Sequence, residues 1–373
     1  MSEERIAEPE SGREAQQPEK QPAPPPRPPR LVRDAERLRR GQLKRLDRKV
    51  RIKGEVLLPC LPALLDEYVS RLSSVFGTLG KAFSAEEIAE LRKLLGIQVE
   101  KGFAKSSLNQ LKVVWWSDDA KDLAVHYRIF IVERSKSGQY EHWVKTRKPP
   151  LFGSHPDAMV MELAKRLPAN ARIADLGAGT GRNTIPLAAA GYRVDAIDST
   201  ASFVQAIRRD AKAKGVADRV VAMQADLFAA PEILALGAYH IVLLSQVVPD
   251  LRRLSDLRHI FARAERLLRS GGYLLFNTFV AGPGYQPDRI TRELSQYMWS
   301  WVLTRDELDE ARRGMHFDLV IDEDAHDYER ARLPEWPPTG WYSHWARGND
   351  LFGLGENEVP PVGLRWLAYR KRG

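Results

Sequence analysis

Two periods of apolar residues alternate along the C-terminal part of the chain. Short apolar runs typical of strands are separated by longer segments with the 3.6-residue period of amphipathic helices. Strands are predicted over 171–177, 193–198, 219–226, 239–246 and 272–279, and helices over 183–191, 201–215 and 256–271. Strands interleaved with helices of this length predict a parallel, doubly wound α/β sheet.

The end of the chain departs from a minimal sheet of this kind. Residues 314–324 are predicted to form a sixth strand, and 362–372 to return as an antiparallel seventh. The long connection between them, about 328–361, is rich in ring-bearing side chains: Trp336, Trp341, Tyr342, His344 and Trp345. Such a segment is either a lid or binding surface, or an apolar cluster that covers the sheet edge or packs on the N-terminal domain. The helical insertion 290–314, with Trp299 and Trp301, is a second lid candidate.

Residues 54–148 precede this sheet and follow another pattern. The stretch from 54 to about 106 is predicted to be helical, and Ser84 is expected to begin one helix with Glu86 and Glu87 in its first turn. The β-branched and aromatic runs 111–116 and 123–134 predict a β-hairpin. This part therefore predicts an α+β accessory domain, and it contains no catalytic motif.

The net positive charge of the chain is concentrated near its N-terminus. Residues 1–30 are charged and proline-rich and are predicted to be disordered. Residues 31–53 form a basic, possibly helical arm, with Leu31, Leu38, Leu46 and Val50 at loose helical spacing. Residues 27–53 have a net charge of +9, so the rest of the +8 chain is close to neutral. This arm is either a docking element for RNA, an acidic partner or a membrane surface, or a solvated arm whose thin apolar stripe packs on the body.

Length and composition limit the number of domains and the kinds of site that the chain can contain. A chain of 373 residues with 43% hydrophobic residues has enough material for a main domain and additional parts. No apolar run is long enough to span a membrane, and the N-terminus does not resemble a signal peptide. Cys60 is the only cysteine, which excludes an intrachain disulfide and any multi-cysteine metal site. The sequence predicts a cytoplasmic protein.

A glycine turn joins the first strand of the sheet to the following helix. It reads G-x-G-x-G, and Asp175 stands before its first glycine. A dinucleotide-binding turn would need its third glycine at position 182, where Arg182 stands. The turn therefore brings the backbone close to a ligand without the usual diphosphate cradle.

The stretch "DLGAGTGRN" resembles the first motif of class I S-adenosylmethionine-dependent methyltransferases, and its "GRN" extension is most similar to the tellurite- and thiopurine-resistance branch. The resemblance covers roughly residues 150–280, with an altered tail to about 370. It implies a Rossmann-like seven-stranded sheet in a domain spanning 149–373, with S-adenosylmethionine as the cofactor. The implied cofactor-binding residues are Asp175, Gly177, Gly179, Gly181, Asn183, Asp198, Ser199, Asp226, Leu227, Ser245 and Gln246.

Three acids carry most of this implication. By resemblance, Asp175 lies near the methionine ammonium, Asp198 binds both ribose hydroxyls and Asp226 meets the adenine amino group. A carboxylate suits a cis-diol because it accepts two hydrogen bonds at once. Each acid alone has a structural explanation, such as a helix cap or a turn, but all three are predicted at the carboxyl ends of strands, where ligands bind in such sheets.

Methyl transfer needs an aligned nucleophile and exclusion of water, and no covalent intermediate. The fourth strand is followed by "SQVVPDL" instead of the signature of enzymes that methylate base amino groups, which favours a small-molecule acceptor. Asp250 is the first candidate for a general base, and His155 is another, either as a lid residue with Phe152 or as a structural residue at a helix start. His240 begins the fourth strand and is predicted to be structural.

The acidic stretch Asp322–Asp327 offers carboxylates and an imidazole, but no defined ligand geometry, so a solvated turn is preferred and no metal is predicted. The leading function is a small-molecule methyltransferase. Two alternatives stay open. One is an RNA or ribosomal-protein methyltransferase docked through residues 27–53, and the other is a non-catalytic scaffold or sensor that binds the cofactor.

Overall fold

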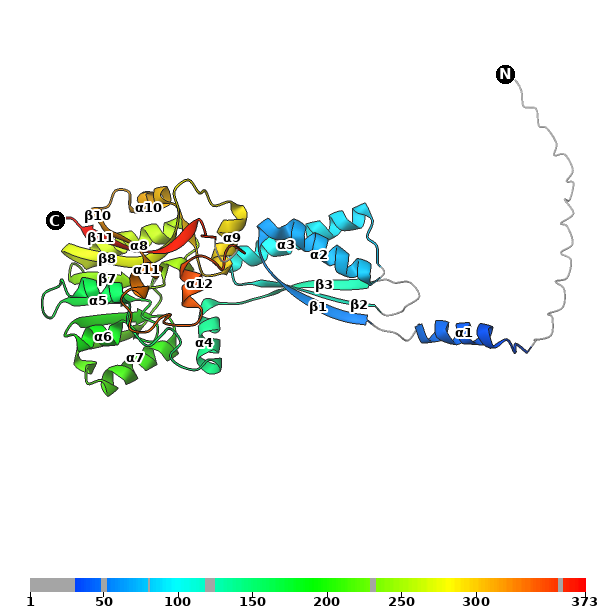
Figure 1. Cartoon of the computed structure of the whole chain (residues 1–373), viewed down its shortest axis with the longest axis horizontal. Coiled ribbons are helices and arrows are strands. Elements are labelled where there is room, and N and C mark those ends of the chain that lie inside the picture. Colours follow the sequence, from blue (N-terminus) through cyan, green and yellow to red (C-terminus); the bar gives the residue numbers. More distant parts are fainter. Residues whose placement is uncertain (1–30, 48–51, 80, 118–124, 229–232, 355–357) are drawn as a thin grey trace, which may run out of the picture.

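A computed structural model describes residues 31–47, 52–79, 81–117, 125–228, 233–354 and 358–373 (Figure 1). The predicted disordered tail 1–30 and Val50 of the basic arm lie outside the described residues. Within the arm, α1 (Ala35–Asp47) is a helix, as its spacing suggests, and every side chain from Leu31 to Leu46 is exposed. The apolar stripe of this helix is therefore not packed on the body.

A large sheet forms the C-terminal part of the molecule (Figure 1). Its strands are β4 (Arg172–Leu176), β5 (Arg193–Asp198), β6 (Val220–Gln224), β7 (Tyr239–Leu244), β8 (Leu268–Ala281), β9 (Val302–Leu303), β10 (Phe317–Asp324) and β11 (Val362–Lys371). The main order is β10-β11-β8-β7-β4-β5-β6, and the two-residue β9 pairs with β8. Strands β4 to β8 are parallel, whereas β11 runs antiparallel to both of its neighbours. The predicted doubly wound sheet with an antiparallel last strand is confirmed.

Helices cover both faces of this sheet. They are α5 (Ala158–Ala164), α6 (Thr184–Ala189), α7 (Ala201–Ala213), α8 (Leu254–Leu267), α9 (Arg289–Tyr297), α10 (Arg305–Arg312), α11 (Ala325–Arg330) and α12 (Tyr342–Ala346), with short turns η2 (Ala217–Arg219) and η3 (Val248–Asp250). Successive strand residues point to opposite faces. Ile241 and Leu243 of β7 belong to one apolar cluster, and Val242 and Leu244 to the other. The fully buried strands explain their continuous apolar runs.

A second, smaller sheet lies at the N-terminal side (Figure 1). It consists of β1 (Ile52–Pro59), β2 (Gln110–Ser117) and β3 (Val125–Val132), all antiparallel. The predicted hairpin is confirmed as β2 and β3. The prediction that the chain is helical from residue 54 is wrong, because 54–59 belongs to β1. The partner of this strand, β2, comes about 50 residues later, and local periodicity cannot show such a pairing.

Two helices cover one face of the small sheet, namely α2 (Leu65–Thr78) and α3 (Ala85–Lys105), with the turn η1 (Pro62–Leu64) before them. The start of α3 is capped as expected: the Glu87 backbone N–H donates to Ser84 Oγ at 3.2 Å, and the Ser84 N–H donates to Glu87 Oε2 at 2.8 Å. A further helix, α4 (Lys136–Thr146), follows β3, and the sequence reasoning did not identify it.

Specific contacts join the small sheet region to the large one. The Ala63 backbone N–H donates to Glu293 Oε2 at 2.6 Å, and Arg252 Nη2 donates to the Phe103 carbonyl at 2.5 Å. The Arg252 guanidinium also lies 4.8 Å from the centre of the Phe103 ring. Gln110 Nε2 at the start of β2 also donates to Tyr297 Oη of α9 at 3.3 Å, so the start of β2 and the start of α4 lie next to the carboxyl ends of the large sheet.

Candidate functional site

A cavity of about 300 Å³ opens at the carboxyl ends of β4, β5, β6 and β7. We call it the cofactor cavity. Of the eleven residues predicted to bind the cofactor, only Gly181 is absent from its lining. The topology explains why residues separated by up to 71 positions meet, because the ends of adjacent parallel strands lie at one edge of the sheet.

Glycine is required at the turn after β4. Gly177 has φ 78°, and a Cβ atom there would lie 2.4 Å from Val247 Cγ2. Gly179 has φ 55°, which favours glycine, and a Cβ atom there would lie in ordinary contact with the Phe152 ring, at 3.6 Å. Gly181 has φ 87° and faces Ile207 of α7 instead, so its role is to let helices pack closely.

Asp198, the last residue of β5, is held by two backbone groups. The Gly179 N–H donates to Oδ2 at 2.9 Å and the Thr200 N–H to Oδ1 at 2.8 Å. Burial raises the pKa of this carboxyl, and the two N–H groups oppose that shift. Each oxygen has two lone pairs, so each can accept one further hydrogen bond from a ligand.

Asp226 and Leu227 line the same cavity just after β6. Asp226 Oδ1 accepts from the Phe228 N–H at 2.7 Å, which orders this turn. Ser199, Ser245 and Gln246 also line the cavity, and the Gln246 backbone has φ 57°.

Asp175 is buried at the base of the glycine turn. Its Oδ2 accepts from Thr184 Oγ1 at 2.6 Å. Burial raises its pKa to about 6, although the hydrogen bond from Thr184 and the nearby Arg182 charge oppose the shift. The carboxyl lines the cavity, so a positively charged group bound there would favour its ionised form and lower its pKa.

A buried ion pair supports the turn, and the sequence reasoning missed it. Arg182 donates from Nη1 and Nη2 to the two oxygens of Asp157, at 2.6 and 2.9 Å. Asn183 Nδ2 and Ser245 Oγ also donate to Asp157 Oδ2, at 2.8 and 2.6 Å. Asp157 stands immediately before α5. In the sequence, the only feature that points to this residue is an acid at the start of a predicted helix. The network fixes the glycine turn against the end of β7.

Asp250 follows β7 and also lines the cofactor cavity. Its Oδ2 accepts from Tyr140 Oη at 3.0 Å, and Lys136 Nζ donates to its backbone carbonyl. Burial raises the pKa of the Asp250 carboxyl, and the Lys136 charge opposes this. Both partners come from α4, so this helix contributes to the site although it precedes the predicted domain boundary at residue 149.

A second cavity of about 530 Å³ adjoins the first, and we call it the aromatic cavity. It shares Tyr140, Phe152, Gln246 and Asp250 with the cofactor cavity. Among the predicted lid residues, Trp341 and Trp345 line it, and Trp299 of the second lid candidate does too.

The other candidate lid residues lie elsewhere. Tyr342 is buried in the core, and Trp336 packs against it with ring centres 5.7 Å apart. His344 lines a third cavity, together with Asp324 and His326. The packing of Tyr342 and Trp336 therefore agrees with the alternative that this part of the segment forms an apolar cluster at the sheet edge.

Neither the candidate His155 nor His240, which is predicted to be structural, lines the cofactor or the aromatic cavity. His155 lies with Nε2 3.8 Å from Glu335 Oε2, and its carbonyl accepts from Arg182. His240 at the start of β7 accepts from the Arg172 N–H at 3.2 Å, in keeping with its predicted structural role.

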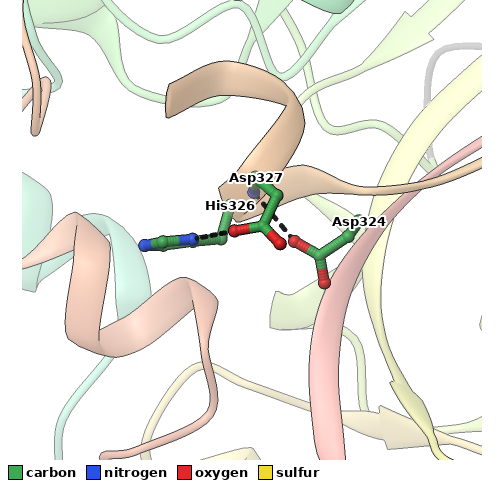
Figure 2. Close-up of side chains that lie close together, drawn as sticks. All are labelled: Asp324, His326 and Asp327. Carbon is green, nitrogen blue, oxygen red and sulfur yellow. Dashed lines mark hydrogen bonds and ion pairs between the residues drawn. The ribbon is translucent and has the colours of Figure 1, made fainter. Parts of the chain in front are cut away.

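The acidic stretch Asp322–Asp327 is not a solvated turn, because β10 ends and α11 begins within it. Asp324, His326 and Asp327 lie together, with one potential ligand atom each within 4.8 Å (Figure 2). One oxygen of each aspartate and both imidazole nitrogens have partners: Asp324 Oδ1 caps α11 by accepting from the Asp327 N–H, and the His326 nitrogens contact Asp327 Oδ1 and Ser343 Oγ. The position of these residues is accounted for by the start of α11, which Asp324 caps. That no metal binds here stays a prediction.

A family comparison bears on the class of the region built on the large sheet. Residues 173–272, from β4 into β8, match the family described as a methyltransferase domain. The matched segment is similar to methyltransferase domains and covers less than half of the chain. The predicted enzyme class, a methyltransferase, is confirmed. No curated protein sequence matches the chain.

Solved structures with a similar fold include three small-molecule methyltransferases. A geranyl diphosphate C-methyltransferase from Streptomyces coelicolor A3(2) is 17% identical, with 57% of this chain and 75% of that chain covered and a TM-score of 0.45. A putative sarcosine dimethylglycine methyltransferase from Galdieria sulphuraria is 14% identical, with 64% and 99% covered and a TM-score of 0.46. Phosphoethanolamine N-methyltransferase 2 from Haemonchus contortus is 15% identical, with 67% and 63% covered and a TM-score of 0.46. Such low similarity does not bear on the acceptor of this chain.

Among the described residues, no helix has the length and apolar character needed to cross a membrane.

Proposed function

We propose that the methyltransferase domain binds S-adenosylmethionine in the cofactor cavity and transfers its methyl group to a small molecule. One observation carries the proposal: Asp175, Asp198 and Asp226 converge on a single cavity with Gly177 and Gly179. The free lone pairs of the Asp198 carboxylate suit the two ribose hydroxyls. Asp175 suits the methionine ammonium, and Asp226 with the Leu227 N–H suits the adenine edge.

The cofactor supplies an electrophilic methyl group on a positively charged sulfur, and the chain has to position an acceptor in line with it. The aromatic cavity adjoins the cofactor cavity through Gln246 and Asp250, at the end where Ser245 is expected to lie beside the methyl group. A cavity of this size is in the range of small-molecule sites, which favours a small acceptor over a macromolecule. The "GRN" extension supports a place near the tellurite- and thiopurine-resistance branch.

The basic arm keeps an RNA acceptor as a second candidate, since α1 is fully exposed and carries many arginines. Salt distinguishes the two, because binding through several phosphates weakens steeply with added salt. Methylation of a small molecule with the same rate at 50 and 300 mM salt supports the leading proposal. A turnover that requires RNA and collapses with salt contradicts it.

The test of the cofactor site is a calorimetric titration of S-adenosylhomocysteine into the full-length protein, with NADH as a negative control. Asp198→Ala removes the ribose carboxylate, and Asp210→Ala on the exposed side of α7 is a charge-matched control. Binding that is lost only in Asp198→Ala supports the proposal. Equal binding by all three proteins, or none by the wild type, overturns it. Binding without any turnover would favour the scaffold alternative.

A further inference from the structure

The aromatic cavity is built from parts of the chain that are far apart. Gln110 comes from β2, Tyr140 and Trp143 come from α4, Trp299 follows α9, and Trp345 lies in α12. Seven of its sixteen lining residues are aromatic. The family match at 173–272 includes only two of the sixteen, so most of this cavity is built by residues outside the matched segment.

The rings are held in a defined arrangement. Trp143 and Trp299 are stacked with centres 5.3 Å apart and planes 27° apart, and Tyr140 meets Trp299 edge-on at 5.2 Å. The Trp299 backbone has φ 59°, a conformation that costs energy for a bulky residue and persists only where the surroundings hold it. One such contact is visible, since Trp345 Nε1 donates to the Trp299 carbonyl at 3.2 Å. Walls of this kind bind flat aromatic molecules through stacking and edge contacts.

The charges in the lining do not favour an ionic acceptor. Arg134 and Arg147 are balanced by Asp250 and Asp350, which leaves a formal charge of zero. The Arg147 guanidinium already lies 4.1 Å from the centre of the Trp143 ring, where a cationic acceptor would otherwise bind. A neutral ligand therefore fits this lining best.

The wall shared by the two cavities contains one carboxylate that can receive a proton. Asp250 Oδ2 accepts from Tyr140 Oη at 3.0 Å. Over the described part of the chain, no hydrogen bond to Asp250 Oδ1 is found, so this oxygen is available for a single donor. A hydroxyl group has one proton to donate, whereas an uncharged primary amine has two.

We propose that the aromatic cavity binds a neutral, planar aromatic acceptor and directs its phenolic hydroxyl toward Asp250 and the cofactor cavity. The inference rests on the proposed function, because it needs S-adenosylmethionine in the neighbouring cavity. In the reaction, a lone pair of the hydroxyl oxygen forms a bond to the methyl carbon. The bond between that carbon and the sulfonium sulfur breaks, and its electron pair stays on sulfur. The hydroxyl proton passes to Asp250, and the products are an aryl methyl ether and S-adenosylhomocysteine.

The test uses the full-length protein saturated with S-adenosylhomocysteine, so that the cofactor cavity is filled. The probes are 2-naphthol and decahydro-2-naphthol, which share a carbon skeleton and a hydroxyl but differ in aromaticity. Calorimetry is expected to show that 2-naphthol binds at least tenfold more tightly. Equal affinities, or no binding of 2-naphthol, would overturn the inference. The prior titration of S-adenosylhomocysteine tests the proposed function separately, so the two failures are distinguishable.

Substitutions in the aromatic cavity test whether 2-naphthol binds there. Trp143→Leu and Trp299→Leu are each expected to weaken 2-naphthol binding by about threefold to tenfold, the loss of one aromatic contact. Trp116→Leu is the matched control, since Trp116 lies on the small sheet and lines neither cavity. All three are expected to bind S-adenosylhomocysteine as the wild type does, which shows that they fold. An equal loss in Trp116→Leu, or no loss in the other two, would contradict the site.

Turnover tests the acceptor atom. With S-adenosylmethionine present, 2-naphthol is expected to yield 2-methoxynaphthalene, and Asp250→Asn is expected to reduce kcat at least tenfold while 2-naphthol still binds. Preferential methylation of 2-naphthylamine would overturn the assignment of a hydroxyl acceptor. Full activity of Asp250→Asn would overturn the role of Asp250.

Discussion

The cofactor cavity and the aromatic cavity share a wall but are assembled differently. Apart from Phe152 and three residues of α4, the cofactor cavity comes from one stretch, residues 175–251, in which each strand end contributes in turn. The aromatic cavity takes its walls from β2, α4, the segment after α9 and the region around α12. One cavity therefore follows from the order of the strands, and the other depends on how distant segments pack.

The difference extends to what holds each cavity in place. The cofactor cavity relies on backbone geometry at glycines, fixed by the buried pair of Arg182 and Asp157. The aromatic cavity relies on contacts between the small sheet region and the region of the large sheet, such as those of Glu293 and Arg252. Loss of the Arg182–Asp157 pair is expected to destabilise the cofactor cavity and its surroundings, whereas damage to the aromatic cavity is expected to weaken acceptor binding and leave cofactor binding unchanged.

The largest effect is expected from Asp157→Asn. The substitution keeps the shape but leaves the buried Arg182 without its counter-charge, which costs about 3–5 kcal/mol for pairs of this kind. Urea denaturation of the variant measures this loss in the free energy of unfolding. Asp318→Ala removes an exposed ion pair with Arg372 and is expected to change little. A similar small change in both variants would show that the network does not hold the glycine turn.

The next effect concerns ligand binding. Asp198→Ala removes a carboxylate expected to accept two hydrogen bonds, so the affinity for S-adenosylhomocysteine should fall roughly a hundredfold or more. The affinity for 2-naphthol should fall much less, because Asp198 does not line the aromatic cavity. Calorimetric titrations of each ligand compare the two losses. Equal losses would mean that the two cavities form one site.

A pH-dependent effect is expected from Asp175, whose pKa is raised by burial to about 6 from an ordinary value of 3.8. Between about pH 4 and 6 the folded protein binds more protons at this group than the unfolded chain does. The contribution of Asp175 to the free energy of unfolding therefore falls as pH rises through this window, by about 2–3 kcal/mol in total. Urea denaturation at several pH values should show a shallower decline in Asp175→Asn than in the wild type. Identical slopes would contradict the raised pKa.

The smallest effect is expected from a substitution that weakens the packing around the aromatic cavity. Glu293→Ala removes the acceptor of the Ala63 N–H and should lower the free energy of unfolding by about 1–2 kcal/mol. It should also weaken 2-naphthol binding severalfold while S-adenosylhomocysteine binding stays unchanged. Glu310→Ala on the exposed side of α10 is the control. Loss of S-adenosylhomocysteine binding in Glu293→Ala would show that the two cavities are not independent.

The sequence by itself determined the large sheet and ten of the eleven residues predicted at the cofactor cavity. The central strands β4 and β7 are largely buried and have clear apolar runs, and the helices between the strands have their own period. Once the strands are parallel, the residues at their carboxyl ends have to meet, so Asp175, Asp198 and Asp226 could be placed together without coordinates. Gly181 was assigned to the same cavity but packs against α7, because spacing along a turn does not reveal which way each glycine faces.

Only the tertiary structure decided the remaining features. The strand β1 depends on pairing with β2, and Asp157 meets Arg182 across 25 positions of sequence. Tyr140 and Lys136 reach Asp250 from a helix that had no recognisable motif. The aromatic cavity exists only where segments that are far apart in the sequence pack together. Contacts between distant segments are selected by the fit of side chains in three dimensions, and that fit leaves no regular spacing in the sequence.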